Sequence, residues 1–140
     1  MALVTRASSP SMDANQANQV ATGELYAGED LDAVAPCYIK TSDGKVYMSD
    51  GAASNEAAKC HGFTPRAILT GEPVTLFGAG TRFKFGVAMT PGTTLYLYPS
   101  DVYDGAGNLG TTTSTGDTKG TAFAVSATDI VVCRVDPKNG

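Results

Sequence analysis

Short stretches of strand-forming residues, separated by turn residues at close intervals, constrain the fold of this 140-residue chain most strongly. Asp43-Gly44, Thr70-Gly71 and Pro91-Gly92 each lie between two apolar stretches, and such dipeptides mark turns between strands. Residues 82–87 alternate between polar and apolar side chains, as in a strand with one buried face. The pattern predicts an all-β fold, a small β-barrel or sandwich.

The same reading places the individual elements. Strands are expected at 33–40, 45–50, 63–69, 72–77, 82–87, 93–98 and 130–135. Residues 54–59 predict one helical turn capped by Ser54. In the alternating strand, Phe83, Phe85 and Val87 are expected to face the core. Residues 93–98 and 130–135 are apolar on both faces, so they are expected to be covered twice or to lie in a subunit interface.

A weak internal repeat indicates that the β unit is duplicated. Residues 44–50 parallel residues 92–101, and residues 60–76 parallel residues 118–132. Each half reads as strands separated by Gly-centred turns. The repeat predicts two related units that close into a barrel or sandwich.

Residues 1–22 differ in composition from the rest of the chain. Residues 8–19 are small and polar, with too few apolar side chains to offset the entropy of ordering. We expect a polar, extended N-terminal arm at 1–22, either disordered or ordered against a partner, and a β-barrel or sandwich domain at 23–140. The first residues lack the apolar stretch of a signal peptide, so the protein is expected to be made in a cytoplasm.

The charges argue against nucleic-acid and membrane partners. The net charge is −4, and the basic residues are scattered rather than clustered as phosphate binding requires. No basic amphipathic segment and no stretch of ~20 apolar residues is present. Glu24, Glu29, Asp30 and Asp32 form an acidic patch, interpreted as a solvated face or an acidic binding edge.

No group of residues has the pattern of a catalytic, metal or cofactor site. His61 is the only histidine, and its neighbour Cys60 should point to the opposite face of a strand. The three cysteines have no metal-ligand spacing and are expected to be reduced. Asp101 to Asn108 is the best calcium candidate, but its spacing fits a hairpin loop better. Residues 116–121 have the wrong order for a phosphate loop and predict a turn.

Three stretches carry a family resemblance. They are GFTPRAILTGEPV at 62–74, GTTLYLYPS at 92–100, and residues 116–132 with AFAVSATDI at their end. Over residues 33–135 the chain resembles the head-decoration (cement) proteins of tailed phages, which are small β proteins rich in Gly and Thr. The resemblance implies a structural protein without enzymatic activity that binds the outer surface of a bacteriophage capsid and stabilises the head.

The resemblance also implies partners and contact residues. The partners are the major capsid protein and two further copies of the chain, in a homotrimer on the exterior of the virion. Contacts with the capsid are assigned to the arm, at Leu3, Val4, Arg6, Met12 and Val20. The oligomer interface is assigned to the doubly apolar strand, at Leu95, Tyr96, Leu97 and Tyr98.

A second hypothesis is a virion-surface module that recognises a host glycan or receptor. Tyrosine rings can stack on sugar rings, and the chain offers Tyr47, Tyr96, Tyr98 and Tyr103 for this purpose. Like the first hypothesis, it requires no catalytic group.

Overall fold

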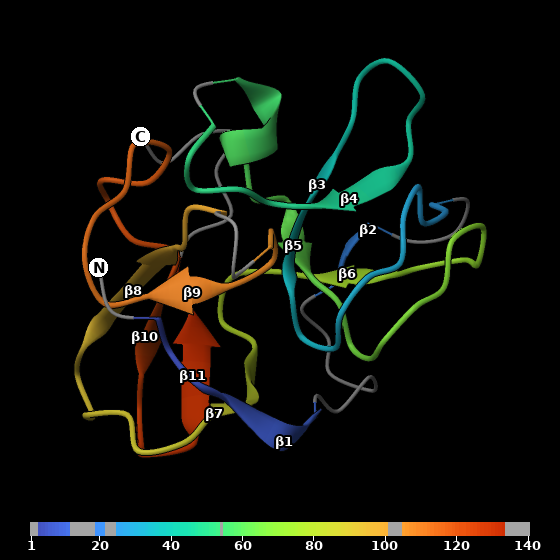
Figure 1. Cartoon of the computed structure of the whole chain (residues 1–140). Helices are drawn as coiled ribbons and strands as arrows, with labels where there is room; N and C mark the ends of the chain where they lie inside the picture. The colour runs from blue at the N-terminus through green and yellow to red at the C-terminus, as the bar shows by residue number, and fades with distance from the viewer. Residues whose placement is uncertain (1–2, 12–18, 22–24, 54, 101–104, 134–140) are drawn as a thin grey trace.

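The computed structural model describes residues 3–11, 19–21, 25–53, 55–100 and 105–133. Its regular structure is almost entirely β-strand, in two antiparallel sheets (Figure 1), which confirms the predicted all-β fold. The elements are β1 (Arg6–Ser11), β2 (Gln19–Ala21), β3 (Pro36–Ile39), β4 (Val46–Met48), η1 (Glu56–Ala58), β5 (Gly62–Phe63), β6 (Leu76–Phe77), β7 (Arg82–Gly86), β8 (Thr94–Leu97), β9 (Leu109–Gly110), β10 (Ala122–Ala124) and β11 (Asp129–Val132).

The first sheet has six strands, in the order β1-β7-β11-β10-β8-β9, and curls into a half-barrel. The residues just before β1 bring its two edges together. Leu3 forms an antiparallel bridge with Gly110, and the Val4 N–H donates to the Leu109 carbonyl oxygen at 2.9 Å. The N-terminal segment thus joins β7 on one side to β9 on the other.

The second sheet has five strands, in the order β2-β6-β5-β3-β4. Residues 25–31 run along it and link β4 to the stretch before β6. Ala27 forms a parallel bridge with Val46, and Leu31 forms an antiparallel bridge with Ile68. These residues pack in a cluster of their own with Val74 and Leu76, among others.

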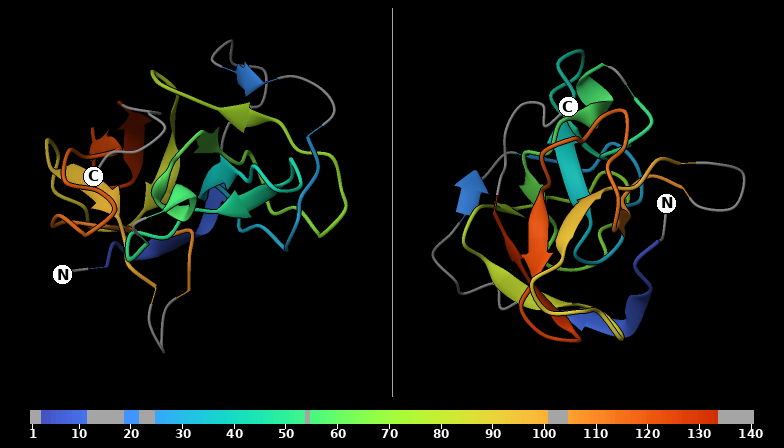
Figure 2. Two further views of the ribbon diagram at one scale, coloured as in Figure 1. Left: turned by 90° about the horizontal axis from the view of Figure 1, so that it is seen from above. Right: turned by 90° about the vertical axis from the view of Figure 1, so that its left-hand side faces the viewer.

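The larger core lies between the two sheets. Figure 2 shows the orange-to-red strands on one side and the cyan-to-green strands on the other. Phe63 of β5 meets Phe83 of β7 across the gap, with ring centroids 5.4 Å apart. Both sheets contribute buried side chains to this cluster, among them Val4, Val34, Cys60, Phe77, Phe85, Leu95, Leu97, Leu109, Ile130 and Val132.

The two sheets repeat one strand order. Numbered by their order in the chain, strands β2 to β6 lie across the sheet as first, fifth, fourth, second and third. Strands β7 to β11 lie across the other sheet in the same order, as β7-β11-β10-β8-β9. The duplication predicted from the sequence is therefore present in the topology. The sequence repeat correctly paired β5 with β10 and β6 with β11, but it set β4 against β8, whereas the strand order makes β3 the counterpart of β8. Strand β1 has no counterpart among the described strands.

The predicted turns form as expected. Gly71 and Gly92 have φ values of +86° and +89°, and each occupies the third position of a turn closed by a backbone hydrogen bond. Asp43-Gly44 joins β3 to β4, and these strands pair with Cys37 opposite Met48. The expected strand at 63–69 shortens to β5. The helical turn forms, but its cap is Asn55, whose side chain accepts from the Ala57 N–H.

Residues 1–22 were expected to form a polar arm with too few apolar side chains to order by itself, but the described residues 3–11 contribute to the core. Val4 and Ala7 are buried, with 7% and 6% of their surface exposed, and Val4 belongs to the larger core. Ser and Pro residues give β1 little strand propensity of its own. The segment is ordered because the half-barrel supplies backbone partners and an apolar slot, neither of which local composition reveals.

Two expectations about strand faces also need correction. Phe83 and Phe85 face the core as predicted, but β7 ends at Gly86, and Val87 lies beyond it on a groove, 44% exposed. A Cβ atom on Gly86 would lie 2.9 Å from the Thr5 carbonyl oxygen, so the close approach of the N-terminal segment requires glycine here. Residues 93–98 are covered within the chain on one face only: Leu95 and Leu97 are buried in the core, whereas Tyr96 and Tyr98 on the other face are half-buried.

Candidate functional site

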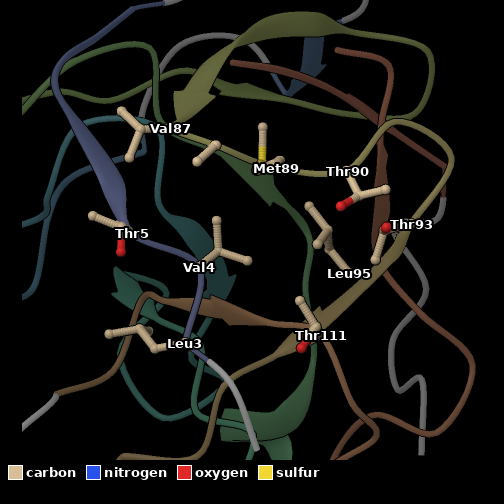
Figure 3. Close-up of a pocket in the computed structure, with 10 residues that line it drawn as sticks. Leu3, Val4, Thr5, Val87, Met89, Thr90, Thr93, Leu95 and Thr111 are labelled. Carbon is tan, nitrogen blue, oxygen red and sulfur yellow. The ribbon is translucent and has the colours of Figure 1, made fainter. Parts of the chain in front are cut away.

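A groove of about 290 Å³ lies between the N-terminal segment and the stretch that joins β7 to β8 (Figure 3). Two of the exposed large apolar side chains, Leu3 (37% exposed) and Val87 (44% exposed), contribute to its lining. The lining residues are Leu3, Val4, Thr5, Val87, Ala88, Met89, Thr90, Thr93, Leu95 and Thr111.

The chemistry of this lining suits an uncharged group. It combines aliphatic side chains with threonine hydroxyls, and it contains no acidic or basic side chain. Such a surface can bury apolar atoms and offer a few hydrogen bonds. The lining contains no carboxylate, imidazole, thiol or ammonium group that could transfer a proton or activate a threonine hydroxyl.

The wall of the groove contains a strained residue. Ala88 has a φ of +54°, a left-handed conformation that is uncommon for a residue other than glycine. Its neighbours are held on both sides: the Val87 N–H donates to the Thr5 carbonyl at 3.1 Å, and the Met89 N–H donates to the Ala127 carbonyl at 3.0 Å. The first bond joins the wall to the N-terminal segment, and the second joins it to the turn between β10 and β11, so the groove is preformed.

Arg6, expected to contact a capsid, is used inside the protein. Its guanidinium donates to Asp32 at 3.3 Å and to the Gly107 carbonyl at 2.5 Å, and it lies 5.1 Å from the centre of the Phe85 ring. Burial lowers the pKa of Arg6, and the Asp32 carboxylate opposes that shift. The side chain therefore ties β1 to the segment before β3 and to the segment before β9.

The other predicted contact residues divide between inside and outside. Leu3 is on the groove, whereas Val4, Leu95 and Leu97 are buried in the core. Tyr96 and Tyr98 are half-buried. Met12 lies outside the described residues, and of Val20 only the backbone, in β2, is described. The structure brings Leu3, Val4 and Leu95 together at the groove, although they were assigned to two different surfaces.

Cys60 and His61 lack the arrangement of a catalytic pair. Cys60 is fully buried, and burial raises the pKa of its thiol to about 12, so the thiol stays protonated near neutral pH. The His61 Nδ1 atom already accepts the Ile39 N–H at 2.9 Å. Cys37 is also a buried thiol, and Cys133 is exposed.

Mild acid should weaken the fold through His61. Burial lowers its pKa below the ordinary 6.5, and nearby Lys59 adds to the effect, so the unfolded chain takes up this proton more readily than the folded one. The associated stability is complete above pH 6.5 and is lost as the pH falls through the folded-state pKa. Urea unfolding followed over about pH 5 to 8 should show this decline.

The matched variant for this test is His61→Asn. An asparagine oxygen can accept the same N–H but does not titrate. The variant should flatten the decline. Asp43 and Asp30 do not contribute in this window, because hydrogen bonds from Tyr47 and Thr70 lower their pKa values below 3.8. An unchanged pH dependence in His61→Asn would contradict the assignment.

The metal candidate is only partly described. Residues 101–104 lie outside the described residues, and the Asn108 side chain donates to the Gly105 carbonyl at 2.9 Å. Within the described part of the chain, no three His, Cys, Asp or Glu side chains converge in a way that could hold a metal ion. In the same residues, no helix is long and apolar enough to cross a membrane.

The tyrosines do not form an open stacking surface in the described region. Tyr38 is buried, and its ring lies 6.0 Å from that of Tyr47. Tyr47 donates to Asp43 at 2.6 Å, and the Lys40 ammonium lies 5.0 Å from the centre of its ring. Tyr103 lies outside the described residues. Tyr26, which was not among the candidates, is the most exposed of the described tyrosines, at 47%.

Sequence reasoning missed the groove and a buried carboxylate. Val87, Thr90 and Thr111 carry no motif, and only the curl of the sheet sets them beside residues 3–5. Asp117 lies in the predicted turn at 116–121 and is fully buried. An Asp three residues before a Gly is a signal for a side-chain-closed turn, but not for burial.

Comparison with known proteins adds no relative from which a role could be transferred. No protein family, no curated protein and no solved structure matches the chain.

Proposed function

We propose that this protein is a capsid decoration protein, which binds the outer surface of a phage head and stabilises it. The proposal rests on the resemblance of residues 33–135 to such proteins and on one structural observation. That observation is the preformed, uncharged groove beside the N-terminal segment, with Leu3 and Val87 exposed along it. An exposed apolar surface of this kind supports a binding role.

The physical requirements of the role are modest. A protein that binds only the assembled shell shifts the equilibrium towards that shell by mass action. It needs a rigid body and a contact surface, but no catalytic group. The half-barrel, held by Arg6 and by the contact of Val4 with Leu109, supplies such a body.

The test mixes heads that lack the protein with wild-type or variant protein, then heats them and counts intact particles. Wild-type protein should bind and raise the temperature of disruption. Val87→Asp should weaken binding about tenfold or more, because burying one valine contributes roughly 1.5–3 kcal/mol. Leu69→Asp is the matched control, since Leu69 is 63% exposed and does not line the groove.

Two outcomes would contradict the proposal at different levels. Wild-type protein that neither binds nor protects heads would refute the decoration role. Loss of binding in Leu69→Asp, with normal binding in Val87→Asp, would refute the groove as the contact surface.

The glycan-binding alternative has less support. Stacking on sugars needs an accessible ring face, and Tyr47 is packed against the backbone of Gly28 and held by Asp43. Tyr96 and Tyr98 are half-buried. A glycan array probed with the wild-type protein separates the two functions, since only the alternative requires a specific sugar signal.

A further inference from the structure

The N-terminal strand is an addition to a unit that is otherwise complete. Strands β7 to β11 have the same order as β2 to β6, and β1 lies outside this shared pattern. It adds to the outer edge of β7, while the residues before it reach β9. The six-stranded sheet can therefore be divided into a five-stranded unit and a strand that the unit holds.

The slot that holds this segment is specific in both backbone and side-chain contacts. Thr5 accepts the Val87 N–H at 3.1 Å, and Val4 donates to Leu109 at 2.9 Å. The Val4 side chain enters the core among large apolar residues. Gly86 leaves room for the passing backbone, since a Cβ there would lie 2.9 Å from the Thr5 carbonyl and 3.1 Å from Val4.

Being part of the same chain gives residues 3–11 only a limited advantage over the same residues of a second copy in binding this slot. Arg6 pairs with Gly86, 80 positions further along, after the chain has formed the whole second sheet. Closing a long loop carries an entropic cost, and a tethered segment has an effective concentration of about millimolar at best. The strand itself is Ser-rich, contains Pro10 and pairs irregularly with β7. The N-terminal strand of a neighbouring copy, held at high local concentration, can therefore compete for the slot.

We propose that the slot between β7 and β9 accepts residues 3–11 of a second copy, so that copies of the chain associate by exchanging their N-terminal strands. The exchanged strand makes the same contacts as the chain's own strand, so the exchange costs little in the folded state. Self-association of this kind would serve the proposed decoration role. It is measured without a capsid, so the two proposals fail independently.

The test uses two full-length variants with complementary defects. Gly86→Val keeps its strand but blocks its slot, because the added side chain meets the Thr5 backbone. Val4→Asp keeps an open slot, but its own N-terminal strand cannot bind there, because a carboxylate would enter the apolar core. Mixed at micromolar concentration, the two should form a complex with one chain of each kind, detected by native mass spectrometry and light scattering.

The double variant, Val4→Asp with Gly86→Val, is the matched control. When it replaces Gly86→Val in the mixture, the complex should fall at least about tenfold, because no intact strand remains. A second measurement uses only wild-type protein: isotope-labelled and unlabelled chains are refolded together and should yield oligomers containing both. If the variants remain separate monomers, or if they fail to fold and the refolded wild-type protein is entirely monomeric, the proposal is wrong.

Discussion

A chain that lacks residues 1–11 should lose most of its stability, about 5 kcal/mol or more of a total that is typically 5–15 kcal/mol. Burial of Val4 alone contributes roughly 1.5–3 kcal/mol. The deletion also uncovers Phe85, which is fully buried, and leaves Asp32 without its ion pair. Urea unfolding of full-length and shortened protein, followed by circular dichroism, measures the loss.

The matched control for this deletion is a change in the same strand that does not reach the core. Ser8 is exposed, so Ser8→Ala should change the free energy of unfolding by less than about 0.5 kcal/mol. A shortened chain with wild-type stability would mean that residues 1–11 are only a polar arm, as their composition predicts, and that their contacts with β7 and β9 stabilise nothing.

Asp117→Ala should lower the free energy of unfolding by about 3–5 kcal/mol. One carboxylate oxygen accepts the Gly120 N–H at 2.8 Å and the Lys119 N–H at 3.2 Å. The other accepts the Leu97 N–H at 3.0 Å and the Thr121 hydroxyl at 2.7 Å. Alanine leaves the buried N–H groups of Leu97 and Gly120 without the carboxylate, at roughly 1–3 kcal/mol for each.

Asp30 provides a control with similar bonds in a different environment. It also accepts a backbone N–H and a hydroxyl, both from Thr70, but at the exposed surface. Water replaces these bonds in Asp30→Ala, so the variant should lose less than about 1 kcal/mol. Equal losses of unfolding free energy in Asp30→Ala and Asp117→Ala would show that burial of the carboxylate does not determine the cost of removing it. Chemical denaturation of both variants at one pH makes the comparison.

Local signals in the sequence were sufficient to predict the fold class and the turns. Gly71 and Gly92 occupy positive φ, which few other residues adopt, so their place in the sequence marks a turn wherever the strands go. Phe83 and Phe85 alternate with charged residues, and this period defines a strand without reference to any partner. The repeated strand order also left a trace, in the segments that became β5 and β10.

The candidate groove was not predictable in the same way. Leu3, Val87 and Thr111 come from three distant parts of the chain, and each is an ordinary residue in its own neighbourhood. They meet because the sheet curls until Leu3 reaches Gly110. A curl is the sum of small twists over many residues, so no local pattern encodes it.

The sequence by itself determined that the chain is all-β, where it turns, and which faces of its most regular strand are buried, because these properties depend on residues a few positions apart. The tertiary structure alone decided that the Ser-rich start becomes a strand, that Arg6 pairs with Asp32 and Gly107, and that Asp117 is buried among four donors. The physical reason is that burial and strand pairing are supplied by residues distant in sequence. A segment of low strand propensity is ordered when those residues offer it both an apolar slot and free backbone partners.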